Sequence, residues 1–183
     1  GLVAREGGSV SNLVANQLLF GFGLGLVAFF VCTILPYKTW YSLAPYVYGA
    51  ALVLTAFVFL PGFGIEHNGS VRWLNLGFVS FQPSEALKVA LIIMLASYFA
   101  THRQELSDPR YSIGGFVLLL AVPTALLLLQ PDHGTLGVIL FTAGVMLVTA
   151  SAPFKHIAIL IATGLLIGIV AFATQPYVQD RVM

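Results

Sequence analysis

The sequence predicts an all-α fold, a polytopic bundle of transmembrane helices. Of its 183 residues, 58% are hydrophobic and only 8% are charged, whereas soluble domains carry about 25% charged residues. So few charges could not cover the surface of a soluble fold, which excludes a cytosolic enzyme and a disordered segment. The net charge of +1 leaves no basic surface for a nucleic acid. The single cysteine excludes an intramolecular disulfide and a metal site built from several cysteines.

Six apolar runs are long enough to cross a bilayer, for which a helix needs about 17–25 residues. They cover residues 18–36, 43–60, 84–100, 113–129, 134–150 and 157–174. Continuous apolar runs indicate helices, because the strands of a membrane barrel alternate in hydrophobicity. Pro123 is expected to kink the fourth span. We expect a single transmembrane domain over residues 1–183, and we expect this chain to be part of a longer protein.

The connections between the spans predict how the bundle is oriented, because positive residues concentrate in cytoplasmic loops. Four positive residues lie in the short connections 37–42, 101–112 and 151–156, namely Lys38, Arg103, Arg110 and Lys155. Three lie in the opposite segments 1–17, 61–83, 130–133 and 175–183, namely Arg5, Arg72 and Arg181. The first set is therefore expected inside. The second set, with the outer loop 61–83, is expected outside.

Two charged residues lie together near the start of the third span, Glu85 and Lys88. Their spacing of three places both on one face of a helix, and Pro83 suits its first turn. Charged residues within an apolar span are costly and often mark function. The pair is either an internal ion pair that satisfies itself or part of a polar cavity that holds a charged substrate group. We favour the cavity, because two leucines could replace a purely structural pair in lipid.

A second polar cluster lies in the short turn between the fourth and fifth spans, Gln130-Pro131-Asp132-His133-Gly134-Thr135. Asp132 is a good N-cap for the helix that follows, and this role alone explains an aspartate here. The alternative is that Asp132 binds a divalent cation or a sugar hydroxyl. We interpret His133 as a solvated turn residue.

The outer loop 61–83 is long, and long connections are often functional. Its Arg72 suits a phosphate group, or it extends to the membrane surface beside an anchoring Trp73. The dipeptide Gln-Pro occurs at 82–83, 130–131 and 175–176, each time at the outer end of a span. Three such helix ends suggest that they converge on one outward-facing polar site.

These motifs closely resemble the SEDS family of bacterial shape, division and sporulation proteins, which comprises FtsW, RodA and SpoVE. The resemblance rests on Asn68-Gly69-Ser70-Val71-Arg72-Trp73-Leu74, on Phe81-Gln82-Pro83-Ser84-Glu85 with Lys88, and on the turn 130–135. It continues to Gln175-Pro176-Tyr177 and Arg181-Val182. The segments 61–64 and 68–70 look closer to the FtsW and SpoVE branch than to RodA.

The resemblance implies a peptidoglycan glycosyltransferase that polymerises lipid II for cell division or cell shape. It implies a multi-pass protein of the bacterial cytoplasmic membrane with ten helices, of which this chain would supply the second to the seventh. The catalytic Asp of the family would lie beyond Met183, so no catalytic residue is assigned here, and residues 1–183 alone should be inactive. Arg72, Glu85, Lys88 and Asp132 match family positions in the substrate cavity.

The resemblance also implies partners and leaves rival functions open. The expected partners are lipid II, the membrane and a class B penicillin-binding protein transpeptidase. A divalent cation, Mg²⁺ or Mn²⁺, is a candidate cofactor, although the sequence itself shows no site for it. A flippase or transporter of lipid-linked precursors would use the same polar cavity. A non-catalytic scaffold of the division machinery would need no charged pair within the bilayer.

Overall fold

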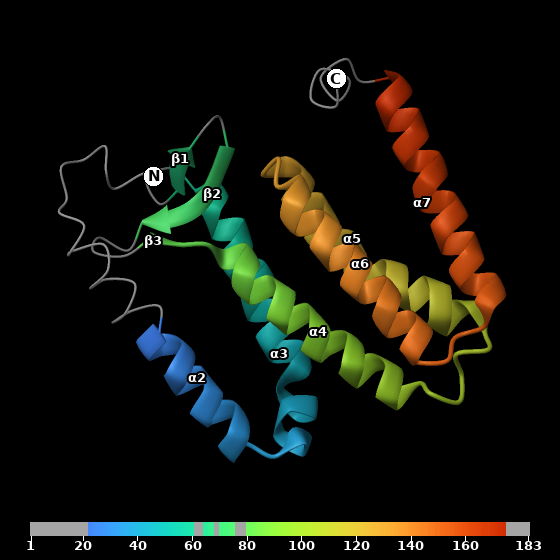
Figure 1. The fold of residues 1–183 in the computed structure, drawn as a ribbon, viewed down its shortest axis with the longest axis horizontal. Helices are drawn as coiled ribbons and strands as arrows, with labels where there is room; N and C mark the ends of the chain where they lie inside the picture. Colours follow the sequence, from blue (N-terminus) through green and yellow to red (C-terminus); the bar gives the residue numbers. More distant parts are fainter. Residues whose placement is uncertain (1–21, 61–63, 68–69, 76–79, 175–183) are drawn as a thin grey trace. The chain divides into compact units, whose positions relative to one another are not determined.

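The structure is a computed structural model that describes residues 22–60, 64–67, 70–75 and 80–174. The described residues divide into two compact units, with the boundary between Ser42 and Leu43. The first unit contains helix α2, Gly23–Ile34, and the start of helix α3, Tyr37–Ala56 (Figure 1). Most of α3 belongs to the second unit, and the 3-10 turn η3, Phe57–Phe59, follows it. These helices lie within the first two predicted spans or overlap them.

The connection expected at 37–42 is wrong, because α3 already begins at Tyr37. Pro36 explains the early start. A proline restricts the residue before it to an extended conformation, and Leu35 is extended, with ψ of 124°. The Pro36 carbonyl then accepts the N–H of Thr39 at 2.9 Å, which opens the new helix. The chain therefore passes from α2 to α3 with almost no loop.

The other four predicted spans are confirmed as helices, with ends that differ by a few residues. They are α4, Pro83–Thr101; α5, Gly115–Leu129, preceded by the π-helix η4, Arg110–Gly114; α6, His133–Thr149; and α7, Phe154–Thr174. Among the described residues, three helical stretches have the length and hydropathy to cross a membrane, Tyr37–Phe59, Pro83–Thr101 and Arg110–Leu129. Gly25–Ile34, His133–Thr149 and Phe154–Leu166 are apolar but shorter.

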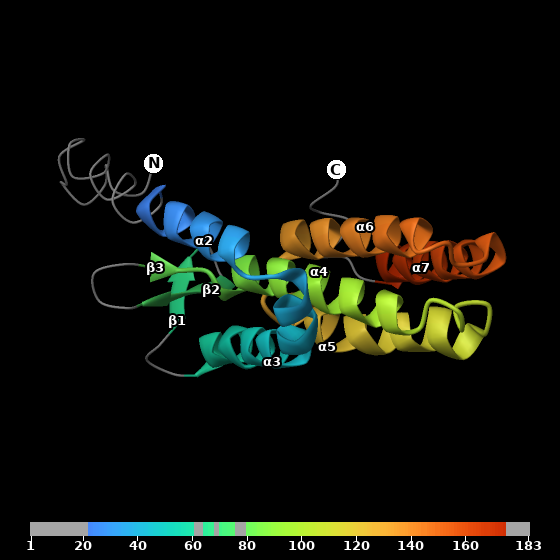
Figure 2. The ribbon, with the colours of Figure 1, turned by 90° about the horizontal axis from the view of Figure 1, so that it is seen from below.

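Helices α4, α5 and α6 run side by side and form the centre of the second unit (Figures 1 and 2). Leucines of α4 fill the core, and Leu87, Leu91 and Leu95 are almost completely buried. They pack with residues of α5 and α6 such as Leu120 and Ile139. Because lipid is as apolar as these side chains, their contribution is close van der Waals packing between the helices. The core therefore fixes the relative positions of the helix ends that build the site.

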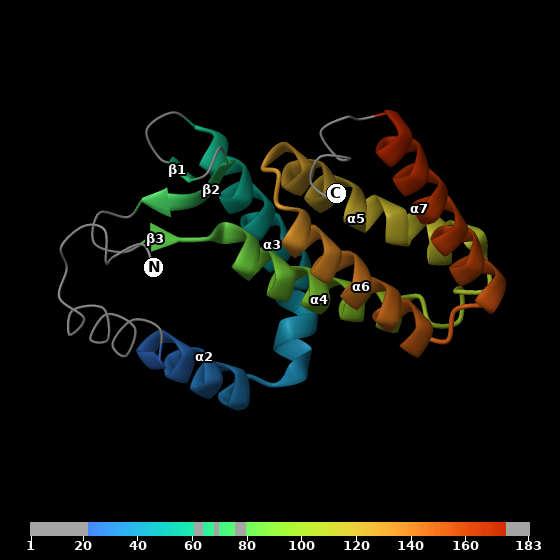
Figure 3. The same cartoon turned by 45° about the horizontal axis from the view of Figure 1, so that its top comes forward.

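A three-stranded antiparallel sheet occupies part of the loop 61–83, and the all-helical prediction did not include it. Its strands are β1, Gly64–His67; β2, Ser70–Asn75; and β3, Ser80–Phe81, in the order β1-β2-β3. Gly64 pairs with Leu74, and Leu74 pairs with Phe81 on its other side. Figure 3 shows the sheet beside the start of α4 and the end of α3. The sheet thus carries Arg72 to the ends of the helices.

Candidate functional site

Asp132 lies where the turn after α5 leads into α6, and it caps α6 as the sequence predicts. Its Oδ1 accepts the backbone N–H of Thr135 at 3.3 Å. Its Oδ2 accepts hydrogen bonds from Gln82 Nε2 at 3.3 Å and from Ser84 Oγ at 3.4 Å. The residue is only 4% exposed. A buried carboxylate needs such donors, so Asp132 joins the start of α4 to the start of α6.

Arg72 reaches this carboxylate from strand β2. Its Nη1 lies 3.7 Å from Asp132 Oδ1. Its Nε donates to the carbonyl of Gln130 at 3.4 Å, and its Nη2 donates to the carbonyl of Pro131. These carbonyls follow the last residue of α5, where backbone acceptors lack partners within the helix and a positive charge is favourable. Arg72 therefore caps the carbonyl groups at the C-terminal end of α5 and also pairs with Asp132.

Gln130 ties the same turn to α3. The residue is 2% exposed, and its Nε2 donates to the carbonyl of Thr55 at 3.0 Å. Thr55 lies one residue before the last residue of α3, among the carbonyls that a helix leaves unpaired. The ends of α3 and α5 and the starts of α4 and α6 thus meet in one junction. We call it the outer junction, after the side on which this end of the bundle is expected, and define it by Thr55, Arg72, Gln82, Ser84, Gln130 and Asp132.

Two of the three Gln-Pro dipeptides meet at the outer junction, as the sequence suggests. Gln82 binds Ser84 at 3.0 Å and Asp132 at 3.3 Å, and Gln130 binds α3. The third dipeptide, at 175–176, lies outside the described residues. Ser84, Gln82 and Gln130 were not assigned as site residues from the sequence, although the repeated dipeptide pointed to two of them. The Thr55 contact uses a backbone carbonyl, for which the sequence holds no signal.

Glu85 and Lys88 form an ion pair in the first turns of α4, with Lys88 Nζ 2.8 Å from Glu85 Oε2, which is one of the two arrangements that the sequence left open. The Glu85 side chain is 56% exposed and that of Lys88 is 26% exposed. No hydrogen bond or ion pair among the described residues joins this pair to Arg72 or Asp132. The four residues chosen from the sequence therefore form two pairs. The Arg72–Asp132 pair is saturated by protein groups, and the Glu85–Lys88 pair is accessible.

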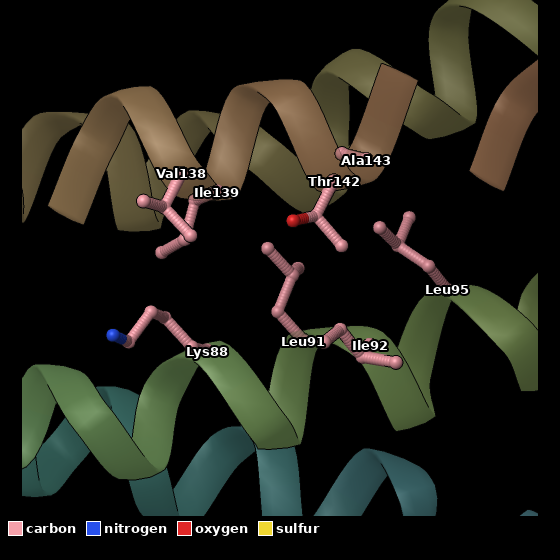
Figure 4. A pocket seen from close by; sticks show the side chains of 8 residues that line it. All are labelled: Lys88, Leu91, Ile92, Leu95, Val138, Ile139, Thr142 and Ala143. Atoms are coloured by element: carbon pink, nitrogen blue, oxygen red, sulfur yellow. The ribbon is translucent and has the colours of Figure 1, made fainter. Parts of the chain in front are cut away.

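Lys88 also borders a narrow crevice between α4 and α6. The crevice has a volume of about 30 Å³, and Figure 4 shows the eight side chains that line it, with the Lys88 ammonium pointing away from the leucines. The other lining residues are apolar except Thr142. A volume of this size holds about one water molecule. A larger group must therefore approach Lys88 from its exposed side and not through the crevice.

The described residues do not gather metal ligands, because they contain no group of three His, Cys, Asp or Glu side chains. Both Asp132 oxygens already accept hydrogen bonds, and Glu85 pairs with Lys88. His133 is exposed, as expected, but it is the first residue of α6 and not a turn residue. A divalent cation stays a prediction.

The fold and the outer junction define a multi-pass helical membrane protein whose polar groups gather at one end of its helices. The sequence model of the FtsW/RodA/SpoVE family, described as cell cycle protein, matches residues 3–183. The chain belongs to this family.

Relatives with known names agree with this assignment. The chain is 36% identical over 173 residues to a probable peptidoglycan glycosyltransferase FtsW of Saccharophagus degradans, covering 93% of this chain and 44% of that protein. It is 34% identical over 172 residues to the stage V sporulation protein E of Bacillus subtilis, covering 91% and 45%. The chain thus spans less than half the length of these relatives.

Solved structures show the same fold. A chain described under "structural coordination of polymerization and crosslinking by a peptidoglycan synthase complex" superposes with a TM-score of 0.74 at 32% identity, covering 93% of this chain and 49% of the other. The rod shape determining protein RodA of Thermus thermophilus superposes with a TM-score of 0.62 at 34% identity, covering 79% and 47%. The expected family fold is therefore confirmed for the part of this chain that superposes.

Proposed function

We propose that the whole protein is a peptidoglycan glycosyltransferase that polymerises lipid II at the outer face of the bacterial cytoplasmic membrane. Relatives that carry this activity in their names support the proposal. The structural observation that carries it is the accessible Glu85–Lys88 pair in the first turns of an apolar helix. Charged groups are rare in such helices and mark substrate paths.

The chemistry of lipid II assigns a role to Lys88. A sugar hydroxyl attacks the anomeric carbon of the growing glycan, the bond from that carbon to the diphosphate oxygen breaks, and undecaprenyl diphosphate leaves. The hydroxyl proton passes to a general base, which the family resemblance places outside residues 1–183. The Lys88 ammonium would stabilise the negative charge that develops on the departing diphosphate. Such a contact is stronger in a low-dielectric site than in water.

Arg72 and Asp132 act differently in this proposal. Arg72 uses its guanidinium on Asp132 and on two backbone carbonyls, so it holds the outer junction in shape. Asp132 keeps the starts of α4 and α6 together. The outer junction would thereby fix the first turn of α4, from which Glu85 and Lys88 project. These residues are positioning residues, whereas Lys88 touches the substrate.

The test compares Lys88→Ala, Lys88→Arg and the control Arg103→Ala in the whole protein, with lipid II as substrate. Arg103 is an exposed cation on the connection after α4. We expect Lys88→Ala to lose most glycan polymerisation, Lys88→Arg to retain part of it, and Arg103→Ala to be unchanged, at equal folded yield. Normal polymerisation by folded Lys88→Ala protein would contradict the role of Lys88. Movement of lipid II across vesicles without any polymer would favour a transporter.

We propose further that the whole protein works with a class B penicillin-binding protein transpeptidase. The support is its likeness to a chain of a complex described as coordinating polymerization and crosslinking. The test is co-purification of the whole protein with each transpeptidase of the same bacterium. The purification is done once with and once without a detergent wash. Recovery of the protein without any transpeptidase under conditions that preserve membrane complexes would contradict it.

A further inference from the structure

Pro123 interrupts the backbone hydrogen bonds of α5 within the core. It lies inside this helix and is fully buried. In an α-helix the carbonyl of each residue accepts the N–H of the residue four positions later, but a proline has no N–H. The carbonyl of Leu119 therefore lacks its regular donor. In an apolar interior such a carbonyl is costly unless another group donates a hydrogen bond to it.

The hydroxyl group of Tyr48 donates this hydrogen bond from a different helix. Tyr48 lies on α3 and is 9% exposed, and its Oη donates to the carbonyl oxygen of Leu119. A buried tyrosine hydroxyl also needs a partner of its own. One contact thus satisfies both the hydroxyl and the carbonyl that Pro123 leaves without a donor.

A second hydrogen bond joins the same two helices on the other side of Pro123. It is the bond from Gln130, the C-cap residue of α5, to the carbonyl of Thr55 on α3. On α3, Tyr48 and Thr55 are seven residues apart, and on α5, Leu119 and Gln130 are eleven apart. At 3.6 residues per turn these separations are close to two and three turns, so each helix uses one side for both bonds. Helix α3 therefore binds α5 both before and after the proline.

Apolar packing does not replace the bond from Tyr48. Helix α5 packs against α4 and α6 through the core, and this packing determines where the helix lies. Apolar side chains carry no donor for the carbonyl of Leu119. Without the Tyr48 hydroxyl, this carbonyl would gain a partner only if the backbone around Pro123 shifted or water entered the core. Either change would disturb the last turns of α5, which lead to Gln130 and Asp132 of the outer junction.

We propose that Tyr48 is a positioning residue, whose hydroxyl replaces the N–H that Pro123 lacks and so keeps the last turns of α5 in place. These turns present Gln130 and Asp132 to the outer junction, which holds the start of α4 and with it Lys88. The inference rests on the proposed glycosyltransferase function for its effect on polymerisation, whereas the donor replacement does not depend on that function. The alternative is a buried phenol that uses the nearest acceptor, for which Pro123 would be irrelevant.

A double-mutant cycle in the whole protein separates these two interpretations. Tyr48→Phe keeps the ring and removes the hydroxyl, so it should lower the midpoint of thermal unfolding by roughly 2–4 °C. Pro123→Ala restores an N–H for the carbonyl of Leu119, so the same Tyr48→Phe change should leave the midpoint almost unchanged in that background. An equal decrease in both backgrounds would overturn the donor replacement. Tyr46→Phe is the matched control at an exposed tyrosine of α3, and it should leave the midpoint unchanged.

The distance along α5 across the proline gives a second readout. Spin labels at Ser107→Cys and Leu129→Cys, both exposed positions, are measured by pulsed electron resonance in lipid nanodiscs, with Cys32→Ser removing the native thiol. We expect one narrow distance in the parent protein and a broader distribution in Tyr48→Phe. Pro123→Val also supplies an N–H, and it replaces Pro123→Ala where the latter is not recovered folded. A distribution in folded Tyr48→Phe protein that equals the parent distribution would overturn the positioning of α5.

Polymerisation of lipid II measures the consequence for the site. Tyr48 touches no substrate, so Tyr48→Phe should lower kcat roughly tenfold with little change in KM, because catalysis is sensitive to small displacements of groups. In the Pro123→Ala background, adding Tyr48→Phe should lower kcat no further. A normal kcat of folded Tyr48→Phe protein would overturn the positioning role. A parent protein that forms no polymer would instead contradict the proposed function, and the unfolding midpoints would still decide the donor replacement.

Discussion

The guanidinium group of Arg72 and the carboxylate of Asp132 lie 3.7 Å apart and connect strand β2 to the start of α6. Each partner also binds groups at other helix ends, the carbonyls after α5 in one case and the polar start of α4 in the other. The pair is therefore a structural element of the outer junction. Replacing either residue should therefore lower the stability of the fold, and any effect on ligand binding should follow from that loss.

Replacing Asp132 with Ala is expected to lower the free energy of unfolding by about 3 kcal/mol, the cost of losing a helix cap and leaving a mostly buried partner unpaired. Asp132→Asn retains an oxygen for the N–H of Thr135 but loses the charge opposite Arg72. It should cost about half as much. Unfolding of purified protein in a detergent series measures both values. Equal losses for the two variants would show that the cap contributes nothing.

Replacing Gln130 with Ala should lower the free energy of unfolding by about 2 kcal/mol, because the buried carbonyl of Thr55 loses its donor. Gln104→Ala is the matched control, since Gln104 is exposed on the connection after α4, and it should change the stability very little. The same detergent series compares the two proteins. A Gln130→Ala protein as stable as the control would mean that water replaces the side chain at no cost.

Gly115 and Gly137 should respond to alanine with opposite signs. A Cβ at Gly115 would overlap the hydroxyl group and ring of Tyr98, whereas a Cβ at Gly137 meets nothing within 4 Å. Gly115→Ala should therefore destabilise the chain by about 2 kcal/mol through overpacking. Gly137→Ala should stabilise it by up to about 1 kcal/mol, because alanine is the better helix former. Thermal unfolding of the two variants checks the signs, and a stabilising Gly115→Ala would show that Tyr98 moves aside freely.

A cysteine at position 107 should not react with an impermeant thiol reagent added outside intact cells. Ser107 lies on the connection with the high density of positive charge, which is expected inside. The matched control is a cysteine at the exposed Ser80 on β3, which should react. Both are introduced with Cys32→Ser. Labelling at position 107 without labelling at position 80 would reverse the orientation of the bundle.

The helices could be predicted from the sequence because long apolar runs leave no other structure in lipid. The start of α3 was missed because residues 37–42 were taken for a loop, whereas Pro36 alone separates α2 from a helix that begins at Tyr37. The sheet was missed although Asn68-Gly69 is a favoured dipeptide of tight hairpins, since the strands around it are short. Segments of two to six residues carry too little periodicity to compete with the helical signal of the whole chain.

The site was only partly predictable. Residue type and position sufficed for the Asp132 cap and for the pairing of Glu85 with Lys88, because both are local relationships. The pairing of Arg72 with Asp132 joins segments that are distant in the sequence, and it depends on how the helices pack. The same is true of the contact from Gln130 to the backbone of Thr55. One sequence contains no record of such distant contacts.

The outer junction can form only after the chain has been synthesised past Asp132. Arg72, Gln82 and Ser84 are synthesised before Asp132, which satisfies all three. When α4 has left the ribosome but the α5–α6 hairpin has not, these three side chains lie at the membrane surface without the Asp132 carboxylate that accepts their hydrogen bonds. We expect nascent chains cut before Gln130 to be held by insertion factors or degraded by membrane proteases. Chains that extend past Thr135 should be released as protected intermediates.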